Sequence, residues 1–499
     1  MTLLFRHSPR AATPFAASRT RLALERLEER AVPTIFTVTN LNDGGAGSFR
    51  QAITAANAAD DSDIINFAAG LSGTINLNVP GADNSNAGGD LDILNPVSIQ
   101  GPGANVITVK QTVVGERVFD VIPAAGVAVA ISRLTITGGN ILSDGGGVRL
   151  VAGSLTLSAV EITGNAAGGL GGGIAEGGVR GIVMTIVNST IANNSSGSLG
   201  GGIIIQSGSA TMTNCTISGN LSSQGGGVAA EGDAGTIRNC TITGNTAMNG
   251  DAGISVGGLI SLTLSSTIVA GNISQGTVGD IGGAVEAASD HNLIGDGTGL
   301  MGLSNGVNGN LIGTAASPIN PLLGPLQFHG GPTRTRVPLP GSLAINNGSD
   351  LVGLASDQRG FPFVRLFGPG VDIGAFETQP TPQPTGQALQ AAIQVFQTLG
   401  ARLAALAFAD MNADFVNDIV LTLRLRNNRL LIVTFDGVSG KVLGVVQPFR
   451  NAIGANARVQ LLTLNLNADP MLEIGLIVTP GGSGVPHISA FTVTGIRLF

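Results

Sequence analysis

The chain has 499 residues, of which 76 are glycine and only 11% are charged, and it contains no tryptophan or tyrosine. This length is enough for two or three domains, and abundant glycine without a strict Gly-X-Y period excludes collagen. The net charge is −7, and basic residues cluster only at Arg424, Arg426 and Arg429, so nucleic acid is not expected as a partner. We find no apolar stretch long enough for a membrane-spanning helix.

Residues 1–33 are expected to form a separate export-type or disordered segment. They contain six arginines but no apolar run that would form the core of a secretory signal peptide. Residues 21–33, with Leu27-Glu28-Glu29-Arg30 followed by Pro33, resemble the Leu-Glu-x-Arg…Pro start of many large bacterial exported proteins. This resemblance implies export. The alternative is a short amphipathic helix without a targeting role.

Residues 34–130 are expected to open a coil of strands. Ser48 follows a glycine-rich turn and is a good N-cap for a short helix from Phe49 to Ala59. The apolar face of this helix would cover the open end of the coil and consists of Phe49, Ala52, Ile53 and Ala56. The segment Ser48-Phe49-Arg50-Gln51-Ala52-Ile53 resembles the Ser-Leu-Arg-Glu-Ala-Ile opening of secreted β-helix proteins.

The stretch from Ile131 to Asn272 repeats itself at a spacing of 25 to 29 residues, which indicates a repeat architecture. Each unit has two short β-rich runs, and the units close at Asn165, Asn194, Asn220, Asn245 and Asn272. Aliphatic residues alternate with threonine and serine, a period of two that indicates strand. The aligned apolar columns are Leu157, Ile186, Met212, Ile237, Leu264 and Ile162, Ile191, Ile217, Ile242, Val269. The pattern predicts stacked parallel strands about 4.8 Å apart with a continuous core.

Two features of the repeat predict where the coil bends. Between the apolar columns lies a third column, formed by Ala159, Asn188, Asn214, Asn239 and Ser266. Asparagine tolerates a left-handed backbone, and stacked amides can bond one another, so we expect a bend and an amide stack there. The glycine clusters are expected at a second bend, which side chains would crowd; they are Gly145-Gly147, Gly171-Gly173, Gly200-Gly202 and Gly225-Gly227.

The two cysteines, Cys215 and Cys240, fall in one column, one coil apart. Their expected Cα separation of about 4.8 Å lies within the reach of a disulfide. In-register side chains point alike rather than at each other, which favours two buried thiols. A disulfide stays open as the alternative.

The Asn-Cys-Thr-Ile-Ser-Gly-Asn unit and the Gly-Gly-Gly-Val/Ile units resemble the right-handed parallel β-helix repeats of pectin-lyase-like surface proteins. The resemblance covers residues 34–377 and implies an all-β fold, a single-stranded parallel β-helix. It does not imply one activity, because that family contains lyases, hydrolases, adhesins and passive stalks.

Residues 273–377 are less regular and richer in proline, and they are expected to close the coil. The segments 292–295, 326–333, 340–348, and 357–361 with 372–377 resemble the closing module of bacterial choice-of-anchor β-helix proteins, which implies a secreted or cell-surface location. We interpret the charges in this module, Asp357 with Arg359 and Asp372, as a structural lock. Residues 378–388 are rich in proline, threonine and glutamine and predict an extended linker.

Residues 389–499 are expected to form a small antiparallel domain of two blade-like repeats. The loop from Asp410 to Val420 recurs 55 residues later, with changes, from Asn465. The first copy resembles the Asp-x-Asn-x-Asp-Gly-x-x-Asp loop of FG-GAP (integrin-type) propeller blades, although Phe415 replaces its glycine. That resemblance implies a Ca²⁺ site whose ligands are Asp410, Asn412, Asp414 and Asp418. Oxygen ligands at alternate positions suit Ca²⁺; a polar turn without an ion is the alternative.

Two functions remain open on the sequence. The coil has few acids, and neither a catalytic triad nor a zinc motif is evident; the acids of the repeats are Asp144, Glu161, Glu176, Glu231, Asp233 and Asp251. This favours a non-catalytic exported structural or adhesion protein whose partner is a surface glycan or a protein, with Ca²⁺ in the C-terminal loop. The alternative is a polysaccharide lyase or glycoside hydrolase with an acidic substrate, which requires acids converging on an exposed face. The sequence alone does not decide whether the protein is an enzyme.

Overall fold

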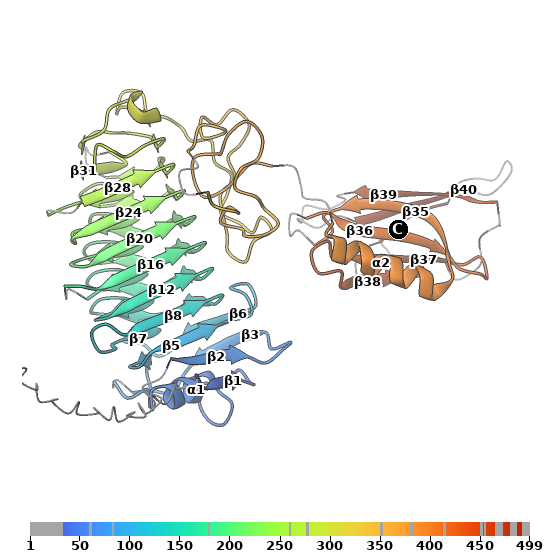
Figure 1. Cartoon of the computed structure of the whole chain (residues 1–499), viewed down its shortest axis with the longest axis horizontal. Coiled ribbons are helices and arrows are strands. Elements are labelled where there is room, and N and C mark those ends of the chain that lie inside the picture. The colour runs from blue at the N-terminus through green and yellow to red at the C-terminus, as the bar shows by residue number, and fades with distance from the viewer. Residues whose placement is uncertain are drawn as a thin grey trace, which may run out of the picture.

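The computed structural model describes residues 33–58, 62–81, 84–177, 180–258, 261–275, 279–349, 353–379, 384–412, 416–449, 453, 456–464, 473–479 and 487–491. The export-type segment proposed for residues 1–33 lies almost entirely outside this set. The described part contains a long parallel β-helix (Figure 1) and a small antiparallel domain. The predicted all-β class, a parallel β-helix with a C-terminal antiparallel domain, is therefore confirmed.

The β-helix is built from four parallel sheets. Between Ala128 and Ala284 each coil visits all four in turn, whereas the earlier coils lack a strand in the third. Sheet 1 consists of β1 (Ile35–Val38), β2 (Asp63–Phe67), β5 (Val97–Gln100), β8 (Ala128–Ser132), β12 (Ser154–Ser158), β16 (Val183–Val187), β20 (Ser209–Thr213), β24 (Ala234–Arg238) and β28 (Ser261–Ser265). Sheet 2 consists of β3 (Gly73–Leu77), β6 (Ile107–Gln111), β9 (Thr135–Thr137), β13 (Glu161–Thr163), β17 (Thr190–Ala192), β21 (Thr216–Ser218), β25 (Thr241–Thr243), β29 (Ile268–Val269), β32 (Leu293–Ile294) and β34 (Leu311–Ile312).

Sheet 4 completes the coils from Leu91 onward, and sheet 3 is added from Asn140 onward. Sheet 3 is short and consists of β10 (Asn140–Ile141), β14 (Ala166–Ala167), β18 (Ser195–Ser196), β22 (Leu221–Ser222), β26 (Thr246–Ala247) and β30 (Ile273–Ser274). Sheet 4 consists of β4 (Leu91–Ile93), β7 (Phe119–Val121), β11 (Val148–Leu150), β15 (Ile174–Glu176), β19 (Ile203–Ile205), β23 (Val228–Ala230), β27 (Ile254–Val256), β31 (Ile281–Ala284) and β33 (Leu300–Met301). A single 3₁₀ turn, η1 (Val307–Gly309), precedes β34.

The core follows the predicted columns. Leu157 pairs in register with Ile186, and Ile162 pairs with Ile191 on the neighbouring sheet. All ten members of the two apolar columns are fully buried and belong to one continuous cluster that runs from Val38 to Ile294. Stacking like on like removes these aliphatic side chains from water, the main favourable term in folding.

The first predicted bend is confirmed by the backbone. All five residues of the bend column have a left-handed φ: Ala159 (52°), Asn188 (52°), Asn214 (53°), Asn239 (48°) and Ser266 (46°). The expected amide stack forms at one step, where Nδ2 of Asn214 donates to Oδ1 of Asn188 at 3.2 Å. Oδ1 of Asn239 instead accepts from Nη2 of Arg365 at 2.9 Å, so this column also contacts a distant part of the chain.

A continuous amide ladder forms elsewhere, in the asparagines that close each repeat. Nδ2 of Asn194 donates to Oδ1 of Asn220 at 3.0 Å, and Nδ2 of Asn220 donates to Oδ1 of Asn245 at 2.9 Å. Asn165 extends the ladder at one end and Asn272 at the other. The first four of these asparagines are at most 1% exposed, so their amides are structural rather than available to a ligand.

The glycine clusters lie at the crowded second bend, as predicted. A Cβ on Gly172 would lie 2.3 Å from the carbonyl oxygen of Ser195, and a Cβ on Gly226 would lie 2.4 Å from that of Thr246. The backbones of successive coils therefore approach too closely there for any side chain. Cys215 and Cys240 are free and buried thiols, in agreement with the preferred alternative.

The helix α1 (Phe49–Ala56) covers the first coil, and the side chain of Ser48 caps it by accepting from the backbone N–H of Gln51. The predicted apolar face is buried. The helix is shorter than predicted, because Asn57 follows it and bonds to the next coil. Nδ2 of Asn57 donates to the carbonyl oxygen of Asp92 at 2.7 Å, and its Oδ1 accepts from the N–H of Leu94 at 2.9 Å.

Residues 313–349 and 353–379 run back along the outside of sheet 2 (Figure 1). Oε1 of Gln358 accepts from the hydroxyl of Thr216 at 2.6 Å, and its Nε2 donates to that of Thr190 at 2.9 Å. Ala344 and Ile373 pack on apolar side chains of the coil, namely Ile268, Ala270 and Leu293. The segment thus covers one outer face of the β-helix.

The predicted structural lock in this segment contains the expected ion pair between Asp357 and Arg359, but Asp372 is not part of it. Nη2 of Arg359 lies 2.6 Å from Oδ2 of Asp357, and both side chains are buried. Asp372 does not share this ion pair. Its carboxylate accepts from the backbone N–H groups of Asn346 and Thr378, at 2.8 and 2.6 Å.

The C-terminal domain contains two antiparallel sheets and the helix α2 (Gly386–Leu399). One sheet has the order β35 (Arg402–Ala409), β36 (Asp418–Arg424), β37 (Leu430–Phe435), β38 (Val442–Val446), and the other has β39 (Arg458–Leu464), β40 (Glu473–Thr479), β41 (His487–Phe491). Thr385 caps α2, which therefore begins inside the stretch predicted as an extended linker. Within the described residues, no helix is long and apolar enough to span a membrane.

Candidate functional site

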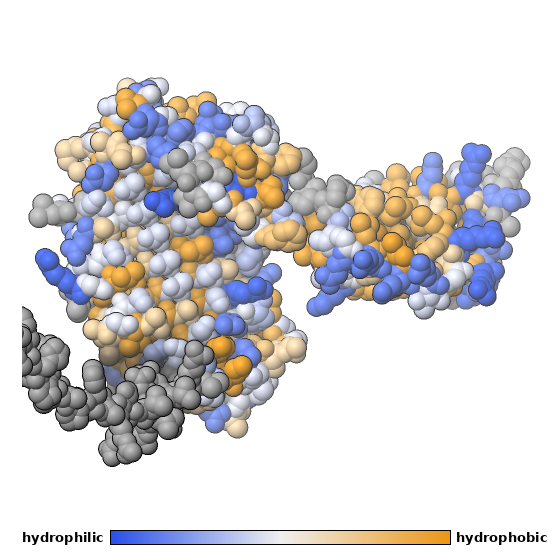
Figure 2. Space-filling view, in the orientation of Figure 1, coloured by the Kyte–Doolittle hydropathy of each residue, from blue (hydrophilic) through white to orange (hydrophobic). Residues whose placement is uncertain are grey.

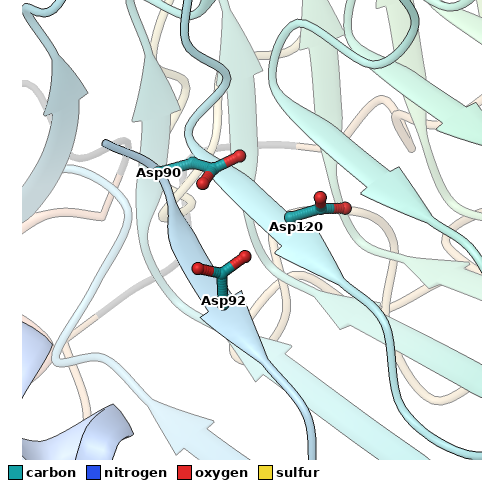
Figure 3. Close-up of side chains that lie close together, drawn as sticks. All are labelled: Asp90, Asp92 and Asp120. Atoms are coloured by element: carbon teal, nitrogen blue, oxygen red, sulfur yellow. The ribbon is translucent and has the colours of Figure 1, made fainter. Parts of the chain in front are cut away.

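Three carboxylates gather near the N-terminal end of the β-helix (Figure 3). Asp92 and Asp120 lie on the adjacent strands β4 and β7, and Asp90 directly precedes β4. One carboxylate oxygen of each lies within 4.8 Å of the corresponding oxygens of the other two. This is the one group of three or more acidic, histidine or cysteine ligands at metal-binding distance among the described residues, and we call it the aspartate cluster.

The repeat itself brings these acids together. Asp92 pairs in register with Asp120, and Asp120 pairs with Arg149 on β11. These residues occupy the middle position of each strand, where the side chain points away from the core. Because stacked coils place like positions next to each other, Asp92 and Asp120 become neighbours, an arrangement that costs free energy unless positive charge lies nearby.

Arginines supply that charge. Nη1 of Arg117 lies 3.2 Å from Oδ2 of Asp90 and 3.0 Å from Oδ2 of Asp120. Nε of Arg149 donates to Oδ1 of Asp120 at 2.8 Å, and its Nη2 contacts Oδ2 of the same carboxylate. Arg117 therefore bridges two of the three acids. Its guanidinium group offsets their negative charge in the position that a bound cation would otherwise occupy.

A third arginine connects the cluster to the N-terminal helix. Nε of Arg50, on α1, donates to Oδ1 of Asp43 at 2.8 Å, and its Nη1 donates to the carbonyl oxygen of Asp90 at 2.7 Å. Its Nη2 donates to the carbonyl oxygen of Gly89 at 2.9 Å. The side chain of Arg50 thus links the covering helix to the first complete coil through hydrogen bonds.

The aspartate cluster is closed off from solvent. Asp90, Asp92 and Asp120 are 3%, 0% and 1% exposed. Nη2 of Arg117 donates to the hydroxyl of Ser143 in a loop that lies over sheet 4. Equivalent loops of later coils stack on this one through backbone hydrogen bonds, and Leu170 and Leu199 in these loops pack on Ala175 and Ile204 of the same sheet face.

This geometry determines what the cluster can do. General acid–base catalysis needs a carboxyl group within hydrogen-bonding reach of a substrate. Here Asp90 and Asp120 face arginines, and Asp92 accepts from the backbone N–H of Asn86 at 2.8 Å. The spacing is short enough for one divalent cation, but Arg117 already supplies compensating charge between Asp90 and Asp120. The cluster is therefore best described as a buried ion network that joins α1 to the first coils.

Burial, reinforced by the neighbouring Asp92, raises the pKa of Asp90 from 3.8 to about 7, although Arg117 opposes the shift. Because the folded-state pKa lies above the unfolded-state value, Asp90 contributes stability at low pH that is lost as the pH rises towards 7. We expect the Asp90→Asn variant to avoid this loss. Its free energy of unfolding relative to the unmodified protein should increase by roughly 3–4 kcal/mol between pH 4 and pH 8.

This prediction is checked by urea denaturation of both proteins at the two pH values. The exposed acid Asp233 provides the control, because Asp233→Asn should change stability by a similar small amount at both. A constant difference between Asp90→Asn and the unmodified protein across this range would contradict it.

Of the predicted metal ligands, Asp410, Asn412 and Asp418 lie at the end of the C-terminal domain where β36 begins. Both oxygens of the buried Asp418 accept from backbone N–H groups, Oδ2 from Met411 at 2.9 Å and Oδ1 from Gly437 at 2.7 Å. Nδ2 of Asn412 donates to Oδ2 of Asp436 at 3.1 Å, which brings the loop next to the following turn. Asp410 directly follows β35 and is partly buried.

Asp414 and most of the second copy of the loop lie outside the described residues. The oxygen chemistry of Asp410 and Asn412 fits Ca²⁺. Asp418 braces the loop in this structure through its two N–H donors. Sequence reasoning did not anticipate that Asp436 would come to the same place.

The acids that the sequence singled out on the coil do not join one another in a site. Glu161 contacts Arg334 of the segment that covers sheet 2, and Oε2 of Glu176 accepts from the backbone N–H of Gln206 at 3.0 Å. Sequence reasoning missed the aspartate cluster. The sequence does contain a pattern that predicts it. Asp92 and Asp120 are each flanked by apolar strand residues, and they lie 28 positions apart, within the range of the repeat.

Comparison with known proteins finds no matching family model, no matching curated protein and no matching solved structure.

Proposed function

We propose that this protein is a non-catalytic, exported β-helix protein with a structural or adhesive role on the bacterial cell surface or in the extracellular space. The observation that supports this most is the state of the aspartate cluster. Its acids are buried beneath a loop; Asp90 and Asp120 are paired with arginines and Asp92 accepts from the backbone N–H of Asn86. A lyase or hydrolase instead needs carboxyl groups that can reach a polysaccharide. The buried core, continuous over the stacked coils, suits a rigid spacer.

Export and surface location are supported by the resemblances in the sequence. The start of the chain resembles those of exported bacterial proteins, and residues 292–377 resemble a choice-of-anchor closing module. In the structure the second half of that segment lies against the coil through buried hydrogen bonds, such as those of Gln358. A covering layer of this kind would protect the outer face of sheet 2 outside the cell. The partner would be a surface glycan or a surface protein.

The experiment that tests this function is a screen of the purified full chain against acidic and neutral polysaccharides, including polygalacturonate and alginate, with and without Ca²⁺. We expect no release of unsaturated uronides or reducing ends from any of them. A glycan array run in parallel would report binding. Turnover of any polysaccharide in the screen would overturn the non-catalytic proposal in favour of the lyase or hydrolase.

We further propose that the loop from Asp410 to Asp418 binds Ca²⁺, with Asp410, Asn412 and Asp414 as oxygen ligands braced by Asp418. Ligand binding to the folded state alone stabilises it, by about 2.7 kcal/mol at a hundredfold excess over Kd. We therefore expect Ca²⁺ to raise the melting temperature of the C-terminal domain and EGTA to reverse the change. The variant Asp410→Ala, Asp414→Ala should lose the response, whereas Asp233→Asn on the coil should keep it. A Ca²⁺ response that survives in the double variant would contradict this ligand set.

A further inference from the structure

The arginines of the C-terminal domain that the structure describes gather at one end of it. Arg402 begins β35 and pairs in register with Arg424 at the end of β36. Arg458 begins β39 in the other sheet. Two more, Arg426 and Arg429, lie in the turn between β36 and β37. The tertiary structure thus adds Arg402 and Arg458 to the short basic cluster that the sequence shows.

The acids whose side chains the structure describes in this domain lie at its opposite end. Asp410 follows β35, Asp418 begins β36 and Asp436 follows β37. At about 3.4 Å per strand residue, Asp418 lies roughly 20 Å from Arg424 along β36. Figure 2 shows strongly hydrophilic residues at the end where β35 begins, on the right of the view. The domain therefore has a cationic end and an anionic end.

The pairing of Arg402 with Arg424 is unfavourable by itself, because like charges directly opposite on neighbouring strands repel. Within the described residues, neither Arg402 nor Arg458 forms an ion pair with an acid. Arg424 is held in place, since its Nη2 donates to the carbonyl oxygen of Ala457 at 2.7 Å. In the aspartate cluster the corresponding repulsion is offset by arginines of the chain. At this end of the domain an anion from outside the chain would offset it.

Three of these arginines line a hollow of about 650 Å³, namely Arg402, Arg424 and Arg458. The hollow lies where the edge strands β35 and β39 begin side by side, and it is lined by residues 402–404 and 458–460 of these strands. An edge strand keeps backbone N–H groups that no neighbouring strand uses, and these add to the guanidinium donors. Ligand sites usually measure roughly 300–1,000 Å³, so the hollow has room for a body attached to an anionic group.

We propose that this hollow binds a phosphate monoester carried on a sugar, as in a phosphorylated surface glycan. A phosphate monoester carries about −1.5 to −2 charges at pH 7 and three acceptor oxygens, so it can accept from Arg402 and Arg458 together. Arg424 stays on Ala457 and forms part of the wall. Gln460 and Thr479 also line the hollow, and their side chains can bond to sugar hydroxyls.

The lining favours a sugar over a nucleotide. Single-stranded nucleic acids are usually held by aromatic side chains on which the bases stack. The described residues that line the hollow include no aromatic side chain. The proposal narrows the partner in the function proposed above to a phosphorylated glycan, and it rests on that function only in the choice of a surface glycan.

The test measures binding of small probes to the full chain by calorimetry. The probes are glucose 6-phosphate, glucuronate, glucose, inorganic phosphate and thymidine 5′-monophosphate. We expect glucose 6-phosphate to bind at least about tenfold more tightly than each of the others, a difference of about 1.4 kcal/mol. Equal affinity for glucuronate would contradict the assignment to phosphate, and equal affinity for inorganic phosphate would contradict the role of the sugar. Tighter binding of thymidine 5′-monophosphate would point to a nucleic acid and overturn the proposal.

Two double variants locate the site. Arg402→Gln with Arg458→Gln should weaken binding of glucose 6-phosphate by about tenfold or more, because both guanidinium donors are lost. Arg426→Gln with Arg429→Gln removes the same charge at the same end of the domain but outside the hollow, and should weaken binding by less than about threefold. All four side chains are exposed, so both variants should fold, which circular dichroism checks. Equal weakening by the two variants would show that binding follows net charge rather than the hollow.

Failure of this site and failure of the proposed function give different results. The polysaccharide screen reports turnover, whereas calorimetry reports binding alone. A chain that binds none of the probes and degrades no polysaccharide would overturn the phosphate site and leave the structural role in place. Turnover together with tight binding of glucose 6-phosphate would overturn the non-catalytic function and support the site.

Discussion

Replacing Asn220 with leucine is expected to lower the free energy of unfolding by about 3 kcal/mol or more, since each buried polar group left without a partner costs about 1–3 kcal/mol. Asn220 is fully buried in the amide ladder. Its Oδ1 accepts from both N and Nδ2 of Asn194, at 2.9 and 3.0 Å, and its Nδ2 donates to Oδ1 of Asn245 and to the carbonyl oxygen of Ile191. Leucine has a similar volume but satisfies none of these groups.

The measurement is urea denaturation of the β-helix followed by circular dichroism. Asn249→Ala is the matched control. Asn249 is an exposed asparagine on the neighbouring coil, and its Nδ2 donates to the hydroxyl of Ser223 at 3.0 Å. Its substitution should change stability by less than about 0.5 kcal/mol. If Asn220→Leu were as mild as this control, the ladder would not be a main source of stability.

Replacing Gly201 with alanine should be comparably damaging, for a steric reason. A Cβ at this position would lie 2.5 Å from the carbonyl oxygen of Leu221 and 2.6 Å from that of Gly226. Both atoms belong to the backbone of the next coil and cannot move aside as a flexible side chain could. Overpacking typically costs 1–3 kcal/mol, and we expect the upper end, about 3 kcal/mol, because the shift must pass to the coils above.

Gly44→Ala is the control for this substitution. A Cβ on Gly44 would meet no atom within 4 Å, and the backbone there is not left-handed. The change in the free energy of unfolding should stay within about 1 kcal/mol, because alanine reduces the conformational entropy of the unfolded chain and this offsets any small cost in the folded state. Thermal denaturation of the two variants side by side distinguishes the outcomes, and similar melting temperatures would show that the coils can separate at Gly201 without cost.

These expectations share a physical origin in the stacking of equivalent positions. A column that is buried and apolar adds to the core with every coil, and a column of asparagine adds one amide bond with every coil. The same geometry places Asp92 beside Asp120, where it is unfavourable without Arg117 and Arg149. Repetition therefore amplifies both good and poor choices of residue, and Arg117 and Arg149 accompany the one place where two stacked strand positions are both acidic.

Much of the β-helix could be predicted from the sequence because its signals are local and repeated. The alternation around Ile162 and Ile191 predicts strands, and the spacing of the repeats predicts which positions stack. The left-handed bend at Asn188 and Asn214 follows from residue type alone. Which asparagine column forms the ladder did not follow, since both columns recur at the same spacing. The closing asparagines bond to one another, whereas amides of the bend column bond to the segment that covers sheet 2: Asn214 to the carbonyl oxygen of Ser356 and Asn239 to Arg365.

By itself, then, the sequence determined the winding: period-two strands, a repeat of 25 to 29 residues and tight bends lead to stacked parallel coils. Only the tertiary structure decided what covers the coils and which charges meet. Gln358 donates a hydrogen bond to Thr190, 168 residues earlier in the chain. Arg50, on a separate helix, donates to the carbonyl oxygen of Asp90. Such pairings depend on where distant segments lie in space, and no local pattern encodes them, because side-chain hydrogen bonds and ion pairs act only over a few ångströms.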